Sequence, residues 1–273
     1  MNADLKAKCI EDFGDQWSRY RGNDGFYGSL ELLQDMFGPI LNVADISGSR
    51  VADIGSGTGR IVSMLLAAGA VHVTAIEPSV AFDVLQENTR PAADQVTLIQ
   101  STGEAIPESG QFDMVFSIGV LHHIPDPAPV VAAAYRALRP GGRICIWLYG
   151  REGNETYLAI IEPLRALTKR VPHWLLSLIV RLLDLPLMIY VWLCKFLRLP
   201  LSHYMRNVVS KLSGDKRRLT VYDQLNPAHA KYYTQSQAKS LLEDAGFSEI
   251  SLYHRHGYSW SLTGVKSASP PAS

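Results

Sequence analysis

Residues 51–59 read VADIGSGTG, a short apolar strand that ends in an acid and continues into a turn with three glycines. Glycine has no Cβ atom, so it suits a turn that adopts positive φ or brings its backbone close to a ligand. The pattern that follows predicts a helix over 60–68, with Gly69 as the residue that ends it. These residues therefore indicate a nucleotide-cofactor turn at the end of the first strand of an α/β sheet.

The spacing of the glycines helps to choose between cofactors. A dinucleotide turn has the spacing G-x-G-x-x-G, so that a helix N-terminus can hold a pyrophosphate. Here the spacing is G-x-G-x-G with Asp53 in front of it, and this carboxylate would repel a pyrophosphate. An acid suits a cofactor with positive charge near its adenosine, and S-adenosylmethionine carries both an ammonium and a sulfonium group.

A second acid follows the next expected strand, over 71–77. Glu77 lies at the end of that strand, where a carboxylate can accept hydrogen bonds from the two hydroxyls of a ribose. The alternative interpretation is that Glu77 caps a strand-to-helix turn without any cofactor. Its distance from the glycine turn favours the ribose interpretation.

Two later segments agree with the first two. Residues 112–120 predict a buried strand, and LHHIPDP at 121–127 predicts a turn that opens the next helix. The segment ALRPGGR at 137–143 predicts a helix end and a Pro-Gly turn before a strand over 144–149. Over residues 49–150, the four segments in this order resemble the class I S-adenosylmethionine-dependent methyltransferases.

This resemblance implies an α/β fold with a doubly wound, mainly parallel seven-stranded sheet and an antiparallel end strand. N-terminal helices and a helical cap insertion would complete it. The implied organisation is an N-terminal helical segment or lid at 1–48, a Rossmann-like cofactor-binding core at 49–151, an apolar and basic cap at 152–235, the C-terminal part of the core at 236–266, and a disordered tail at 267–273.

The resemblance also implies contacts to S-adenosylmethionine. Relatives often place an acid of a G-D-A-E-x-L-P stretch near the adenine amine, but the matching STGEAIP at 101–107 has Thr102 there. The adenine contact would come from the Thr102 hydroxyl, from backbone near Gly103, or from Glu104. The expected cofactor-binding residues are Tyr20, Asp53, Gly55, Ser56, Gly57, Gly59, Glu77, Pro78, Thr102, Gly103, Glu104 and Ser117.

The N-terminal segment carries three aromatic residues at helical spacing, Phe13, Trp17 and Tyr20, and a second helix is expected near 28–42. One interpretation is that the aromatic side chains pack this segment onto the core. The other is a lid over the methyl donor, in which Trp17 or Tyr20 contacts the sulfonium by cation–π attraction.

Composition narrows the partners and the compartment. A formal net charge of zero argues against a generic nucleic-acid binder. The three cysteines show no pairing pattern and residues 1–10 have no apolar signal segment, so we expect a reduced, cytoplasmic setting. No acidic cluster follows the expected strands, so no metal is expected.

The insertion contains a strongly apolar stretch at 173–194. Arg181 and Asp184 interrupt it and Pro186 disfavours a continuous helix, so the pattern predicts two short helices rather than one membrane span. Residues 151–218 carry twelve basic and five acidic residues, a net charge of about +7. The helices would either roof a substrate pocket or contact a membrane peripherally through 173–201, with Trp174, Tyr190 and Trp192 as interfacial anchors (anionic lipid being the attracting surface).

For chemistry, His123 is the candidate base, because it follows the fourth strand and a hydroxyl acceptor must lose a proton. A structural role for His123 is the alternative. Where the insertion rejoins the core, further pocket candidates are Tyr222, Asp223, His229 and Tyr233.

The sequence thus predicts methyl transfer from S-adenosylmethionine to an oxygen or nitrogen atom of a small apolar, anionic or lipid-like acceptor. The alternatives are a non-catalytic binding protein that keeps the cofactor fold and a membrane-peripheral protein. The identity of the acceptor and the oligomeric state are not predicted.

Overall fold

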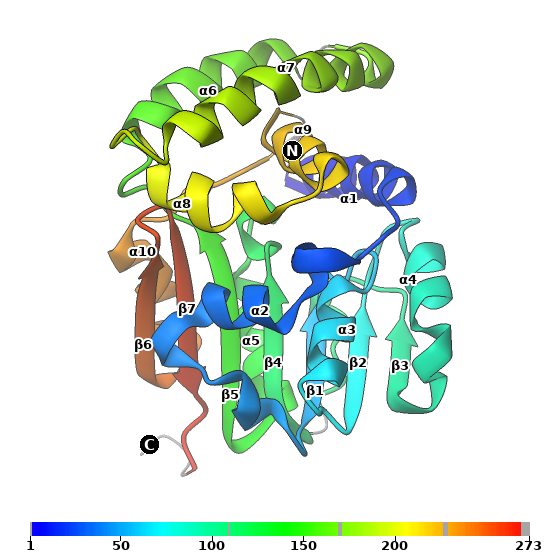
Figure 1. Cartoon of the computed structure of the whole chain (residues 1–273). Coiled ribbons are helices and arrows are strands. Elements are labelled where there is room, and N and C mark those ends of the chain that lie inside the picture. The colour runs from blue at the N-terminus through cyan, green and yellow to red at the C-terminus, as the bar shows by residue number, and fades with distance from the viewer. Residues whose placement is uncertain (1, 109, 169–170, 226–228, 269–273) are drawn as a thin grey trace.

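The computed structural model describes residues 2–108, 110–168, 171–225 and 229–268. Within them lies a seven-stranded sheet of order β3-β2-β1-β4-β5-β7-β6 (Figure 1). The strands are β1 (Arg50–Ile54), β2 (His72–Ile76), β3 (Val96–Ile99), β4 (Phe112–Ile118), β5 (Leu138–Tyr149), β6 (Ser248–Arg255) and β7 (Ser259–Val265).

Strands β1 to β5 are parallel to one another, and β7 lies antiparallel between β5 and β6. The mainly parallel sheet with an antiparallel end, expected from the resemblance, is confirmed. Strand order reverses between β1 and β4, and in open α/β sheets ligands bind at such a reversal, beyond the carboxyl ends of the strands.

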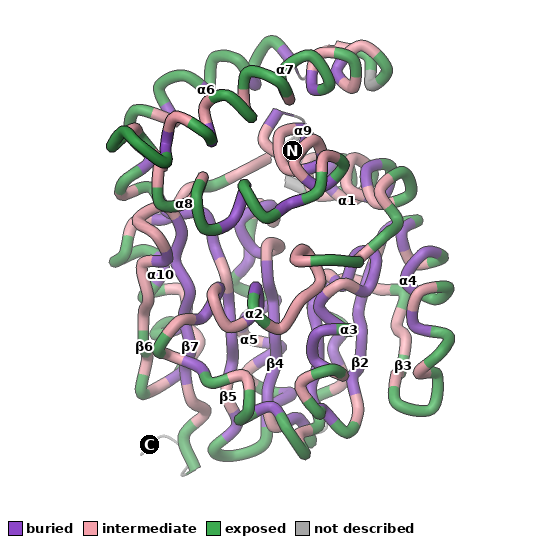
Figure 2. Tube along the Cα trace, in the orientation of Figure 1, coloured by how far each residue is buried: buried purple, intermediate pink, exposed green. Residues whose placement is uncertain are grey.

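Helices cover both faces of the sheet, as Figure 1 shows. One face packs against α5 (Ala128–Ala137) and α10 (Gln235–Glu243), and the other against α2 (Leu30–Phe37) and α3 (Arg60–Ala67). The strands carry near-continuous apolar runs because both of their faces are covered, and the central strands are buried along most of their length (Figure 2). The remaining core helix is α4 (Phe82–Thr89).

The chain also forms a helical layer above the carboxyl ends of the strands (Figure 1). Its helices are α1 (Asn2–Arg19), α6 (Glu155–Thr168), α7 (His173–Leu193), α8 (Ser202–Asn207) and α9 (Gly214–Leu225). Together, α6 to α9 and their connections lie within 152–235, the segment expected as a cap.

Several boundaries differ from expectation for local reasons. The helix expected near 28–42 ends at Phe37, because Gly38 follows with φ +52 and Pro39 comes next. Strand β5 begins at Leu138 rather than at 144, and its pairing with β4 shifts register between Leu138 and Arg143. The expected Pro-Gly turn is therefore an irregularity within a strand, with Gly141 at φ +77.

The prediction of two short helices within 173–194 is wrong, because α7 is one helix of 21 residues with Pro186 inside it. Proline removes one backbone N–H donor and so leaves the carbonyl four residues earlier, that of Leu182, without its helical partner. Leu182 is exposed, so this carbonyl is not sealed in a core where the loss would be most costly. Of the expected tail, residues 269–273 lie outside the described residues.

Candidate functional site

A cavity of about 500 Å³ opens at the carboxyl ends of β1 and β4 and continues beneath the helical layer. Its walls come from the glycine turn, the segments that follow β2, β3 and β4, helix α1, and the inner sides of α6 to α9. The cavity therefore joins the expected cofactor residues to the cap in one continuous space.

The glycine turn presents bare backbone to this cavity. Gly55 and Gly57 both line it with positive φ, of +77 and +54. A Cβ atom at Gly55 would lie 2.5 Å from a methyl carbon of Val120, and one at Gly57 would lie 3.4 Å from Nε1 of Trp17. These glycines keep the space open where the cofactor would approach, which fits the sequence prediction.

Asp53 is 1% exposed and is not among the cavity-lining residues, although its neighbour Ile54 is. Burial raises the pKa of Asp53 to about 7. Its Oδ2 atom has no hydrogen-bond partner among the described residues. A buried carboxyl with one unpaired oxygen behind the turn suits a cation in the cavity, such as S-adenosylmethionine.

Glu77 lines the cavity and is bonded to the glycine turn. Its Oε2 accepts a hydrogen bond from the Gly57 N–H at 2.8 Å, and its Oε1 accepts from the N–H (2.9 Å) and the hydroxyl (2.5 Å) of Ser79. A carboxylate offers about four acceptor sites, so Oε2 keeps capacity for a ribose hydroxyl. These contacts hold Glu77 in place before any cofactor binds.

The segment after β3 places Thr102, Gly103 and Glu104 in the cavity wall. Oε1 of Glu104 accepts a hydrogen bond from Lys6 Nζ at 2.5 Å, and Oε2 is buried without a partner among the described residues. Burial alone would raise the pKa of Glu104, but hydrogen bonds from Lys6, from Thr102 and from the backbone, together with the Lys6 charge, outweigh it and the pKa is lowered. Of the three adenine candidates, Glu104 thus offers a charged acceptor oxygen.

The two lid candidates, Trp17 and Tyr20, lie in different places relative to the cavity. Trp17 lines the cavity, whereas Tyr20 does not and has its ring 6.2 Å from that of Tyr222. Two further expected residues lie behind the wall: Gly59 caps α3, and buried Ser117 donates to the Ile54 carbonyl at 3.5 Å. The remaining expected residues, Gly55, Ser56, Gly57, Glu77, Pro78, Thr102, Gly103 and Glu104, line the cavity.

His123 also lines the cavity, between the glycine turn and the cap. Its Nδ1 lies 2.8 Å from the carbonyl oxygen of His229, and because a carbonyl only accepts, Nδ1 carries the proton. Nε2 is then the unprotonated nitrogen. Burial lowers the pKa of His123 and so keeps the ring neutral. His122 is not among the lining residues and stacks on Tyr149, with the two ring centroids 3.9 Å apart.

A polar network beside His123 includes residues that the sequence did not single out. The Tyr149 hydroxyl donates to Asp223 Oδ2 at 2.8 Å, and Gln16 Nε2 donates to Asp223 Oδ1 at 3.1 Å. Gln224 Nε2 donates to the Tyr149 oxygen at 2.8 Å. Tyr149 is the last residue of β5, which pairs with β4. This position at the end of a strand is the sequence signal that could have identified Tyr149 as a site residue. Tyr222 and Tyr233 are buried but are not lining residues.

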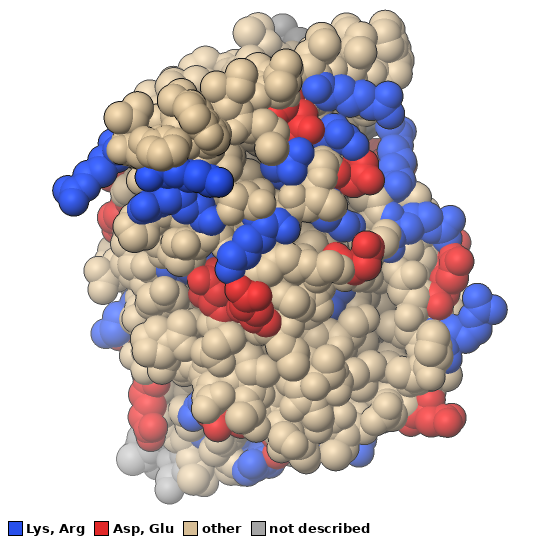
Figure 3. Space-filling model, viewed as in Figure 1, with Lys and Arg blue, Asp and Glu red and all other residues tan. Residues whose placement is uncertain are grey.

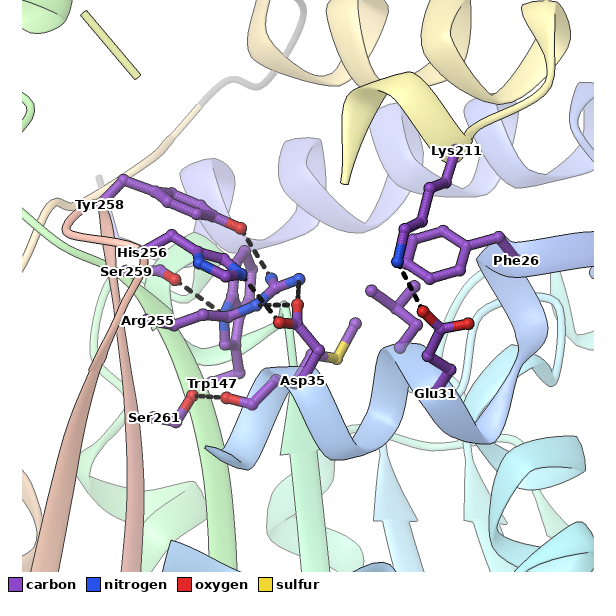
Figure 4. Close-up of polar contacts among 12 residues, drawn as sticks. Phe26, Glu31, Asp35, Trp147, Lys211, Arg255, His256, Tyr258, Ser259 and Ser261 are labelled. Atoms are coloured by element: carbon purple, nitrogen blue, oxygen red, sulfur yellow. Dashed lines mark hydrogen bonds and ion pairs between the residues drawn. The ribbon is translucent and has the colours of Figure 1, made fainter. Parts of the chain in front are cut away.

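Arg255 and Tyr258, also missed, form another part of the cavity wall. Arg255 is 2% exposed and donates to Asp35 from Nε at 2.9 Å and to the Tyr258 hydroxyl at 2.7 Å. His256 Nε2 lies 2.8 Å from the other Asp35 oxygen, so Asp35 lies between two basic side chains (Figure 4). These contacts tie α2 to the β6–β7 hairpin and complete the cavity wall on that side.

Comparison with known proteins agrees with this geometry. Residues 52–146 match the family described as "Methyltransferase domain". The chain is 31% identical over 158 residues to a ubiquinone biosynthesis O-methyltransferase of Methylococcus capsulatus, covering 56% of this chain and 65% of that protein. It is 36% identical over 121 residues to the protein of that name from Pseudomonas putida, covering 43% and 52%.

Among solved structures, the magnesium protoporphyrin IX methyltransferase of Synechocystis PCC 6803, solved with bound SAH, has a similar fold. Its TM-score is 0.56 at 16% identity, covering 97% of this chain and 99% of that one. The strand order, the glycine turn with Glu77 and the family match together define a methyltransferase fold. Residues 52–146 thus match a methyltransferase domain, and the fold and the glycine turn agree with the S-adenosylmethionine-dependent class that the sequence resembles. It spans about half to two thirds of the length of the curated relatives named above.

Proposed function

We propose that the chain transfers a methyl group to an oxygen atom of a small, apolar, lipid-like acceptor held beneath the cap. The observation that carries this proposal is the continuity of the cavity. One space is lined at one end by Gly57 and Glu77 and at the other by cap leucines such as Leu187 and Leu201. A donor and an apolar acceptor can therefore meet in a shared, water-poor site.

Oxygen is favoured over nitrogen by two considerations. The relatives named above are O-methyltransferases by name. In addition, His123 offers a neutral ring with an unprotonated Nε2 in the cavity wall. S-adenosylmethionine, when bound, supplies an electrophilic methyl group on a sulfonium. His123 Nε2 would take the proton of the acceptor hydroxyl as that oxygen attacks, which is general base catalysis.

The network around Asp223 would position the acceptor. Burial and the neighbouring Asp223 carboxylate raise the pKa of Tyr149 well above its ordinary value, so the phenol stays protonated and donates to Asp223. Tyr149 also lies close to the base, with ring centroids 5.6 Å apart from His123. Because α9 supplies Asp223 and Gln224, the cap contributes polar groups as well as apolar walls.

We also place the chain in the cytoplasm, where its apolar acceptor would be drawn from a membrane. The reducing environment agrees with the sequence, in which Cys9, Cys145 and Cys194 show no pairing pattern, and with the burial of all three side chains. The exposed outer side of the cap agrees with membrane association and is taken up in the next subsection.

The test is incubation with methyl-labelled S-adenosylmethionine and a panel of phenols, catechols and aromatic amines, each with and without an alkyl tail, in mild detergent. The expected product is a methyl ether, formed faster from the tailed phenols. Label on nitrogen alone would overturn the oxygen assignment. Binding of S-adenosylmethionine, measured separately by calorimetry, shows whether a negative panel reflects the acceptor or a failed donor site.

A further inference from the structure

The outer side of the cap is apolar. Among the described residues, thirteen of the fifteen exposed large hydrophobic side chains fall within 160–197. They lie on α6, on α7 and on the turn that follows α7. We name this surface the cap face: Ile160, Leu164, Leu167, Trp174, Leu178, Leu182, Leu183, Leu185, Met188, Ile189, Trp192, Phe196 and Leu197. So large an exposed apolar patch marks an interaction surface.

Helix α7 shows that the cap face is not the ordinary back of a packed helix. One stripe of the helix is buried against the protein, at Leu176, Val180 and Val191. The opposite stripe would be polar on a helix that faces water, yet it is also apolar. Trp174 is 69% exposed and Trp192 is 56% exposed, one near each end of α7.

The geometry favours contact with a bilayer surface over a transmembrane orientation. Residues 174–193 are long and apolar enough to cross a membrane, with a mean hydropathy of 1.8. The buried stripe, however, packs against the rest of the cap, including α9, along the length of the helix. A helix held this way can lie in the plane of the interface, with its outer stripe among the acyl chains.

The charged side chains around the cap face indicate which kind of lipid headgroup it would contact. Residues 173–206 contain four basic side chains, Arg181, Lys195, Arg198 and Arg206, all exposed. The acid in this range is Asp184, which is bound by Arg217 at 3.0 Å and Arg218 at 3.5 Å. Figure 3 shows the uncharged surface of α6 and α7 with Lys and Arg side chains gathered along its border. Basic side chains around an apolar face attract anionic headgroups.

The cavity reaches the same surface. Leu164 of α6 and Leu183 of α7 both line the cavity, and both are 39% exposed. These two side chains of the cap face are thus also part of the cavity wall. An amphiphile that leaves a bilayer under the cap face would meet the cavity wall without crossing water.

We propose that the cap face docks on the surface of a bilayer that contains anionic lipid, with Trp174 and Trp192 in the headgroup region. The proposal rests on the proposed function for its purpose, because docking would bring a lipid-like acceptor to the cavity. The contact itself depends only on the cap face and its basic border.

The test is sedimentation of the full chain with vesicles of phosphatidylcholine, with and without phosphatidylglycerol. The wild type is expected to sediment with the mixed vesicles at low salt and at least about 20-fold less with neutral ones. Trp174→Ser with Trp192→Ser should reduce binding by at least about tenfold, because it removes the interfacial aromatic anchors. Val71→Ser, which removes an exposed apolar side chain outside the cap face, should leave binding unchanged.

The contribution of charge is tested with a double variant, Lys195→Gln together with Arg198→Gln. The control is a second double variant, Lys239→Gln together with Arg136→Gln, which changes exposed side chains on the core helices. The first pair should weaken binding to anionic vesicles about 20-fold, and the second should not change it. Wild type that stays in the supernatant, or a tryptophan variant that sediments fully, overturns the proposal. The proposal is also overturned if the chain binds no vesicles and light scattering shows a dimer that the tryptophan substitutions dissociate. A second copy of the chain would then occupy the cap face.

Binding of S-adenosylmethionine by each variant verifies the fold and separates the two proposals. Vesicle binding without any cofactor binding would leave docking in place and overturn the proposed function. Methyl transfer without vesicle binding would leave the proposed function in place and overturn docking.

Discussion

The indole Nε1 of Trp17 lies 3.4 Å from the position of a Cβ atom built on Gly57, and both residues line the cavity. Helix α1 therefore closes directly over the glycine turn. Two bonds hold it there: Lys6 to Glu104 at 2.5 Å, and Gln16 to Asp223 at 3.1 Å. Each bond ends on a residue of the cavity wall, so α1 covers both the glycine-turn end and the cap end of the cavity.

We predict that Trp17→Ala weakens binding of S-adenosylmethionine about tenfold or more, because a desolvated cation–π contact contributes up to about 2 kcal/mol. Isothermal titration calorimetry measures the change. Trp174→Ala is the matched control, since it removes an exposed indole from the cap face and should leave affinity unchanged. An affinity for Trp17→Ala within twofold of wild type would mean that the indole only packs α1 onto the core.

Gly55→Ala is expected to destabilise the fold and abolish cofactor binding. A left-handed non-glycine residue costs about 1–2 kcal/mol, and overpacking against Val120 adds about 1–3 kcal/mol. Gly257→Ala separates the two effects, because Gly257 has φ +75 but no atom within 4 Å of an added Cβ. Urea unfolding should show the smaller loss for Gly257→Ala, with cofactor binding retained. Equal losses in the two variants would contradict the close contact at Gly55.

Binding of S-adenosylmethionine should release a proton near neutral pH. Burial raises the pKa of Asp53 to about 7 in the folded, ligand-free protein, above an unfolded value of about 3.9. The protonated form therefore stabilises the ligand-free fold at low pH, and that contribution is lost as pH rises through about 7. A bound cation favours the carboxylate, so affinity should rise between about pH 6 and pH 8.

Calorimetry at about pH 6.5 in buffers of different ionisation enthalpy measures this release. The apparent binding enthalpy should depend on the buffer in the wild type and not in Asp53→Asn. A buffer-independent enthalpy in the wild type would show that Asp53 does not titrate on binding.

The positions of the candidate cofactor residues around the glycine turn were predictable because their signals are local. Asp53, the glycines and Glu77 are fixed by strand ends and turns, and each pattern spans fewer than ten residues. The Gly57 N–H bond to Glu77 then follows from the parallel pairing of β1 and β2, in which Ile54 lies beside Ile76. In a regular sheet, the pairing of neighbouring strands therefore determines which strand-end residues lie close together.

The cap end of the cavity was predicted less well because its contacts are non-local. Arg255 and Asp35 are 220 residues apart, and nothing near Arg255 in the sequence indicates a buried cation. Pro186 is a second example: proline disfavours a helix interior, but α7 is held on both sides of Pro186 by its buried stripe. Tertiary packing decided both features.

Asp35→Asn should be among the most destabilising polar substitutions in the chain. Burial alone would raise the pKa of Asp35, but the His256 hydrogen bond and the Arg255 charge outweigh it, so the pKa is lowered. Its stabilisation is therefore present above the unfolded pKa and lost as pH falls through the lower, folded pKa. Removing the charge leaves Arg255 buried and uncompensated, at a cost of about 3–5 kcal/mol.

The control for this substitution is Glu87→Gln, which breaks an exposed ion pair with Arg21 and should cost about 1 kcal/mol or less. Chemical unfolding at pH 7 compares the two. Similar small losses in both variants would show that Arg255 is solvated in the folded protein.

His123→Gln should reduce the rate of methyl transfer by about 10²- to 10⁴-fold while leaving the affinity for S-adenosylmethionine unchanged, because glutamine cannot take a proton. In the wild type, burial lowers the pKa of His123, so the rate should fall with decreasing pH only below about 6.5. The pH–rate profile with a phenolic acceptor and calorimetric titration of each variant check both statements. His203→Gln, an exposed histidine outside the cavity wall, should keep the wild-type rate and profile. If His123→Gln retained a tenth of the activity, or if its profile kept the acidic limb, the base would be another group and His123 would only shape the cavity.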